Sequence, residues 1–172
     1  MSLAKAIKAE ALSLGFDAVG ISRVADSKQP SASSRQQDSP PDPVTQFPHL
    51  LLNRLAEWLR LGYYGTMAWM TRDPSRRSDP RLVLPGCQSM VSVGMNYYTD
   101  NRANEQPGMG RIARYAWGKD YHEVMSQRLS QLEAKIAALA PGVTTRSYVD
   151  TGPIMEKAWA QQAGLGWIGK HS

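Results

Sequence analysis

The sequence contains one cysteine, Cys87, among its 172 residues. A single thiol cannot form an intramolecular disulfide, a thiolate zinc site or the ligand set of an iron–sulfur cluster. The sequence therefore excludes a site of any of these three kinds built from its own cysteines. Cys87 follows a Pro-Gly turn and precedes an expected strand. We therefore expect it to pack as a small, inert side chain.

Long apolar runs are also lacking. No stretch approaches the roughly 18 consecutive apolar residues of a membrane helix. The first ten residues mix lysine and glutamate with apolar side chains, unlike a secretory signal. We expect a cytoplasmic monomer without membrane association. The apolar fraction of 42% is too high for a fully disordered chain, and the length suits one domain over residues 1–172.

Metal-ligand patterns and phosphate-binding fingerprints are lacking as well. The three histidines, His49, His122 and His171, are far apart, so no protein-built metal site is expected. Neither common glycine-rich phosphate-binding motif occurs. No arrangement of serine, histidine and acid indicates nucleophilic catalysis.

Positive charge is concentrated in the middle of the chain. The net charge is +5, and residues 54–119 hold ten Lys/Arg against five acidic residues, while both flanking stretches are balanced. A focused basic segment attracts phosphates or an anionic cofactor. An ordinary solvated surface that happens to be basic explains the same distribution.

Hydrophobic periodicity predicts alternating helices and strands. The predicted helices are residues 3–14, 48–61, 119–140 and 153–163, and the predicted strands are residues 17–22, 90–97 and 144–149. Residues 26–48 are rich in Ser, Gln and Pro, which predicts a mobile loop insert. Residues 63–70, rich in aromatics and methionine, are expected to pack as core or line an apolar pocket. The alternation indicates an α/β or α+β fold with a sheet flanked by helices.

Among the acidic residues, Asp150 is the best candidate for a catalytic role. It follows the strand predicted over residues 144–149, and ligands of open α/β sheets bind outside such strand ends. A carboxyl group there acts as a general acid if burial raises its pKa. Asp150 can equally cap the helix predicted over residues 153–163, and the residue pattern alone favours the cap.

The glycine-rich end of the chain, residues 164–170, has two interpretations. Glycine lets the backbone approach a ligand closely, and Lys170 can meet an anion there. Equally, the glycines can simply turn the chain.

Longer segments carry a resemblance to a known family. The three strongest are residues 110–122 (GRIARYAWGKDYH), 148–157 (YVDTGPIMEK) and 163–172 (AGLGWIGKHS). Residues 14–21 and 74–85 agree with the same family in order and spacing. Together these segments resemble the N-terminal part of the epoxyqueuosine reductases, over nearly the whole chain except the insert.

The resemblance implies a cobalamin-binding domain of the reductive-dehalogenase-like type. Enzymes of this family use cobalamin and two iron–sulfur clusters to reduce epoxyqueuosine to queuosine at the wobble position of tRNAs with a GUN anticodon. An external donor supplies the electrons. The family continues into ferredoxin-type cysteine motifs, so we expect a C-terminally truncated chain without that ferredoxin-type domain and with little or no turnover alone.

The resemblance also implies roles for individual residues. Asp150 is expected to be the proton donor. The residues expected to contact cobalamin are Arg77, Ala113, Asp150, Gly169 and Lys170, and those expected to face the tRNA are Lys157, Arg114 and Lys119. Ala113 stands where some members have a cysteine. Lys157 stands where an arginine is expected, which keeps the charge but loses bidentate phosphate geometry.

Two alternatives to this function stay open at the level of sequence. The chain can be a non-catalytic cobalamin- or tRNA-binding module, which binding without reduction would support. A different cobalamin-dependent reductase, such as a dehalogenase, is a further option. The segments at residues 117–122 and 149–152 disfavour it by likeness alone.

Overall fold

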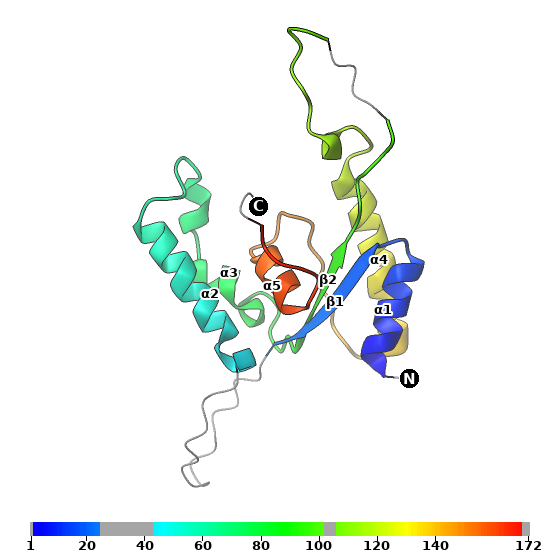
Figure 1. Cartoon of the computed structure of the whole chain (residues 1–172). Coiled ribbons are helices and arrows are strands. Elements are labelled where there is room, and N and C mark those ends of the chain that lie inside the picture. Colours follow the sequence, from blue (N-terminus) through cyan, green and yellow to red (C-terminus); the bar gives the residue numbers. More distant parts are fainter. Residues whose placement is uncertain (1, 25–42, 102–105, 170–172) are drawn as a thin grey trace. The chain divides into compact units, whose positions relative to one another are not determined.

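The computed structural model describes residues 2–24, 43–101 and 106–169 (Figure 1). The helices are α1 (Leu3–Ser13), α2 (Pro43–Arg60), α3 (Pro74–Ser78), α4 (Tyr121–Leu139) and α5 (Glu156–Gln162), and the strands are β1 (Ala18–Arg23) and β2 (Ser89–Gly94). Short 3₁₀ turns cover Ala68–Thr71, Pro80–Leu82 and Arg114–Ala116. These elements form two compact units. The first comprises Met1–Val19 and Val93–Thr151, and the second comprises Gly20–Ser92 and Gly152–Ser172.

The first unit is built on the packing of α1 against α4 (Figure 1). Both helices begin with a side-chain cap, because Ser2 accepts from the backbone N–H of Lys5 and Asp120 accepts from that of His122. The apolar stripes of the two helices supply the buried residues Ile7, Ala11, Leu129, Leu132 and Ile136. The predicted helices over residues 3–14 and 119–140 are therefore confirmed to within two residues at each end.

The second unit has a separate apolar core. Its buried members are Val24, Leu51, Ala158 and Trp159, with Phe47, Cys87, Met90, Ile154 and Met155 packed against them. The ring of Phe47 meets that of Trp159 edge to face at 5.0 Å, an arrangement that aromatic quadrupoles favour. Cys87 packs as expected, and burial raises the pKa of its thiol.

Strands β1 and β2 pair with each other in a two-stranded sheet. The N–H of Asp17 donates to the carbonyl of Gly94 (2.9 Å), and the N–H of Val24 donates to that of Gln88 (2.8 Å). Partner numbers fall as residue numbers rise, so the pair is antiparallel. The described part of the chain is thus a mixed α/β fold with a small, two-stranded sheet.

Two predicted elements at the C-terminal side are wrong in extent or type. Residues 144–149 form an extended loop instead of a strand, because within the described residues no other strand pairs with them. The helix predicted over residues 153–163 begins only at Glu156. The turn before it carries the chain past Pro153 without helical hydrogen bonds.

Two further expectations are corrected in the second unit. The insert predicted over residues 26–48 ends earlier, because α2 begins at Pro43; residues 25–42 lie outside the described part. The segment over residues 63–70 is not core, since Tyr63, Met67 and Trp69 are all exposed. In the described part of the chain, no helix combines the length and apolar character needed to cross a bilayer.

Candidate functional site

Asp150 lies in the loop that follows α4, in the first unit. Its backbone adopts a left-handed conformation with φ of 55°. Such a conformation costs on the order of 1 kcal/mol for a residue other than glycine, and aspartate tolerates it better than most. Asp73 is the other non-glycine residue with positive φ in the described ranges. A strained position of this kind directs attention to what its side chain contacts.

The carboxylate of Asp150 meets the first turn of α4. The Tyr121 hydroxyl donates a hydrogen bond to its Oδ2. Nε2 of His122 lies 3.9 Å from the same oxygen. On the far side of the imidazole, Nδ1 is 2.8 Å from Oδ1 of Asp120. An acid, an imidazole, a second acid and a phenol therefore form one connected cluster.

The local sequence explains how α4 presents these groups. Asp120 is the N-cap, and its carboxylate accepts from the backbone N–H of His122 as well as facing the imidazole. The rings of Tyr121 and His122 stack at 4.1 Å. The cap fixes where the first turn begins, and the stacked rings of Tyr121 and His122 both lie next to the Asp150 carboxylate.

Two pKa shifts accompany this geometry. The hydrogen bond to the Asp150 carboxylate, with burial and the charge of Asp150 adding to it, raises the pKa of Tyr121 to about 12. The backbone and side-chain hydrogen bonds from His122 lower the pKa of Asp120. Near neutral pH, Tyr121 is therefore a hydrogen-bond donor and Asp120 is a carboxylate.

Asp150 is not buried, since 55% of its side chain is exposed. The alternative that it caps the following helix is wrong. Helix α5 has Met155 as its N-cap residue and no side-chain cap hydrogen bond. The carboxylate of Asp150 is held by side chains of α4 and serves no helix terminus.

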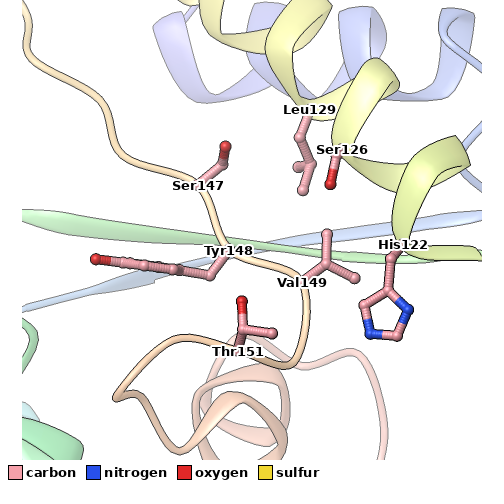
Figure 2. Close-up of a pocket in the computed structure, with 7 residues that line it drawn as sticks. All are labelled: His122, Ser126, Leu129, Ser147, Tyr148, Val149 and Thr151. Carbon is pink, nitrogen blue, oxygen red and sulfur yellow. The ribbon is translucent and has the colours of Figure 1, made fainter.

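A cavity of about 270 Å³ opens beside this cluster (Figure 2). Its lining residues are His122, Ser126 and Leu129 from α4, and Ser147, Tyr148, Val149 and Thr151 from the loop. Asp150 lies between two of them in sequence. The volume falls just below the about 300–1,000 Å³ of pockets that take drug-sized ligands. Water or one small group fits there.

Arg77 belongs to the second unit, where it lies on α3. Its guanidinium lies 5.0 Å from the ring centroid of Trp69 and donates from Nη2 to the Trp69 carbonyl at 3.4 Å. Its Nε is buried and has no hydrogen-bond partner among the described residues. A buried donor without an acceptor is costly, so this N–H is available to an acceptor on a ligand.

The other residues expected at the cofactor are exposed or outside the described part. Ala113 is exposed just before the turn at Arg114–Ala116, in the first unit. Gly169 is exposed in the second unit, two residues beyond Trp167, which is 94% exposed. Lys170 lies outside the described residues. Thus Asp150 and Ala113 share one unit, and Arg77 and Gly169 share the other.

The three residues expected to face tRNA differ in their surroundings. Lys119 is exposed before α4, and Lys157 is exposed on α5. The guanidinium of Arg114 lies 4.7 Å from the ring of Tyr98 and 5.2 Å from that of Trp117. It also donates to the Thr99 carbonyl at 3.1 Å, so Arg114 already has structural contacts within its own loop.

Tyr121, His122 and Asp120 were not among the site residues predicted from sequence. His122 was considered only as a metal ligand. The signal that was present is the polar triplet Asp-Tyr-His at the start of an amphipathic helix, inside a motif that carries the family resemblance.

Comparisons with known proteins agree with one another. Residues 77–151 match the model of the family described as epoxyqueuosine reductase QueG, DUF1730. The chain is 48% identical over 118 residues to the epoxyqueuosine reductase of a Synechocystis strain, covering 69% of this chain and 40% of that protein. It is 42% identical to that of a Synechococcus strain, covering 99% of this chain and 46% of that protein.

A solved structure gives the same result. The crystal structure of epoxyqueuosine reductase with a tRNA-Tyr epoxyqueuosine-modified stem loop matches with a TM-score of 0.73 and 26% identity, over 98% of this chain and 40% of that one. The chain spans less than half the length of these relatives. Over the span that it shares with them, the chain belongs to the epoxyqueuosine reductase family.

Proposed function

We propose that this chain is the substrate-side part of an enzyme that reduces epoxyqueuosine in tRNA to queuosine, with Asp150 as the proton donor. The observation that carries the proposal is the placement of the Asp150 carboxylate. It sits in a left-handed turn, caps no helix, and faces Tyr121 and His122 beside a small cavity. The family to which the chain belongs supplies the reaction.

A cobalamin cofactor is part of this proposal. The buried Nε of Arg77 supports it, because an unpaired N–H suits the amide and phosphate oxygens at the edge of that cofactor. In the glycine-rich segment, a Cβ added at Gly164 or Gly166 would meet no atom of the described residues within 4 Å, so the backbone there is open to close approach. We propose that Arg77, Ala113, Asp150, Gly169 and Lys170 hold the group. When bound, cobalamin would supply a low-potential cobalt for electron delivery.

The chain's own residues bind the substrate and supply the proton. The leaving oxygen of an epoxide must be protonated, and Asp150 performs this step when its carboxyl group is in the acid form. The Tyr121 hydroxyl holds the side chain in place by donating to Oδ2. The small cavity between α4 and the loop is lined by His122 and by Val149 and Thr151, the sequence neighbours of Asp150.

We propose that the RNA contacts come from the exposed cations Lys119 and Lys157, with Arg114 contributing through its aromatic stack. Phosphate contacts of this kind supply affinity, and single-stranded loops present bases that stack on aromatic rings. The protein would act in the cytoplasm, where an external donor provides electrons.

Reconstitution tests the proposal. The chain is mixed with cobalamin, a strong chemical reductant and an epoxyqueuosine-modified tRNA stem loop, and nucleosides are measured by mass spectrometry. A parallel visible-absorbance titration measures cobalamin binding. We expect cobalamin and RNA binding with little turnover by the chain alone, and turnover in a full-length relative.

The full-length relative gives the decisive control. Replacing the aspartate that corresponds to Asp150 with asparagine should abolish reduction there while RNA affinity is kept. An unchanged rate would remove Asp150 from its role. Binding of cobalamin or RNA in that relative without any reduction would favour a non-catalytic binding module instead.

A further inference from the structure

The proposed reduction consumes more protons than one carboxyl group carries. Converting an epoxide to an alkene breaks both carbon–oxygen bonds, forms the carbon–carbon double bond and releases the oxygen as water. This uptake requires two electrons from the reductant and two protons. Asp150 holds one proton at a time, so a second proton must reach the site within the same turnover.

We propose that His122 is the second proton source and that Asp120 positions it; this inference rests on the proposed function. Nδ1 of His122 lies 2.8 Å from Oδ1 of Asp120, and Nε2 lies 3.9 Å from Oδ2 of Asp150. With the Nδ1 proton bonded to Asp120, the second proton of the imidazolium is on Nε2. That nitrogen is the one that faces Asp150.

The transfer balances within the cluster. Asp150 first gives its proton to the oxygen that leaves carbon, and becomes a carboxylate. The Nε2–H bond of His122 then breaks as an O–H bond forms on Asp150, which protonates the oxygen a second time. The gap of 3.9 Å is longer than a hydrogen bond, so the transfer requires the two side chains to approach each other or a bridging water between them. The imidazole regains its proton from solvent, because 43% of its side chain is exposed.

The groups around His122 are consistent with this assignment. Asp120 and Tyr121 face it from the same helical turn, and Asp150 approaches from the loop. Hydrogen bonds from His122 lower the pKa of Asp120, so Asp120 is a carboxylate near neutral pH and accepts from Nδ1 of the imidazole. Tyr121 keeps its proton well above neutral pH, so it is a hydrogen-bond donor to Asp150 rather than a competing acid.

Proton NMR of the histidine ring tests the coupling without any turnover. In the unmodified chain, the Cε1–H resonance of His122 is recorded, and then in Asp120→Asn and Asp150→Asn. Each substitution changes a group that lies 2.8 Å or 3.9 Å from a ring nitrogen, so each should shift this resonance. The resonance of the exposed His49 should be the same in all three proteins. An unchanged His122 resonance in both variants would overturn the inference.

A kinetic test separates this inference from the proposed function. In the cobalamin-loaded full-length enzyme carrying this segment, His122→Gln should lower kcat about 10-fold or more, with RNA affinity unchanged. It should also change the pH dependence of kcat, because the imidazole no longer supplies a proton. His49→Gln is the matched control. If Asp150→Asn is inactive but His122→Gln keeps the normal rate and pH profile, the inference fails alone. If Asp150→Asn is fully active, the proposed function fails.

Discussion

Two aspartates share an unusual backbone conformation and use it differently. Asp73 has φ of 48° and Asp150 has φ of 55°. Asp73 caps α3, where its carboxylate accepts from the backbone N–H of Arg76 and pairs with the Arg76 side chain at 3.7 Å. Asp150 caps no helix and instead meets Tyr121 and His122, about 28 residues away in sequence.

The comparison shows how strain can be interpreted. At Asp73, the cost of the left-handed backbone is offset locally, because the carboxylate caps α3 and such a cap stabilises a helix by about 1 kcal/mol. Among the described residues, Asp150 makes no such cap to the helix that follows it, and its side chain contacts polar groups of α4. Strain that local structure does not offset is the better indicator of a functional position.

Asparagine substitutions should give the largest difference between the two positions. In the cobalamin-loaded full-length enzyme, Asp150→Asn should lower kcat by about 100-fold or more, because the amide cannot donate the proton. Asp73→Asn should leave kcat unchanged, since asparagine also caps helices. Queuosine formation, measured by mass spectrometry of digested tRNA, gives both rates. Equal losses at the two positions would remove the distinction.

Titration of Tyr121 should reveal its hydrogen bond to Asp150, a contact with a distant side chain that Asp73 does not make. Carbon NMR of labelled tyrosine should find Tyr121 ionising at a pKa of about 12, and Asp150→Asn should return it toward 10. Because the folded-state pKa is raised, stabilisation from this pair is complete below pH 10 and is lost as pH rises toward about 12. Asp73→Asn serves as the control and should leave Tyr121 unchanged. A Tyr121 titration that Asp150→Asn does not alter would argue against the contact.

Substitution of Asp73 should lower the free energy of unfolding more than substitution of Asp150. Asp73→Ala removes the cap and places alanine in a left-handed turn, so it should lower the free energy of unfolding by about 2 kcal/mol. Asp73→Gly should cost about 1 kcal/mol less, because glycine adopts this conformation without strain. Urea denaturation followed by circular dichroism measures both. Identical curves for the two variants would show that backbone strain at this turn is negligible.

Glycine at position 150 should have the smallest effect. Asp150→Gly loses the contact with Tyr121 but relieves the left-handed strain, so the free energy of unfolding should change by less than about 0.5 kcal/mol. The same urea denaturation measures it. A loss above about 2 kcal/mol would mean that Asp150 is chiefly a structural residue.

Helical parts of the fold were predictable because their signals are local. The stripe over residues 119–140 and the stop at residues 141–142 predicted α4 closely. The run over residues 144–149 has the β-branched and aromatic composition of a strand, yet strand formation requires a partner. The sequence alone cannot show that no second strand lies alongside.

The candidate site was predictable only in part. Asp150 was identified, but its contacts with Tyr121 and His122 were missed. These contacts depend on how a loop folds back onto the start of a helix, which no local pattern encodes. The left-handed backbone of Asp150 could not be predicted either. Glycine adopts positive φ most easily, so sequence rules would have placed it at the nearby Gly152.

The antiparallel pairing of β1 and β2 has a practical consequence for dissecting the protein. Its hydrogen bonds place Val19 opposite residues 92–93, and the first unit comprises Met1–Val19 and Val93–Thr151. A two-residue Asn-Gly connection from Val19 to Val93 would therefore close a short hairpin. The resulting miniature of about 80 residues would carry α1, α4 and the Asp150 loop, small enough for complete resonance assignment.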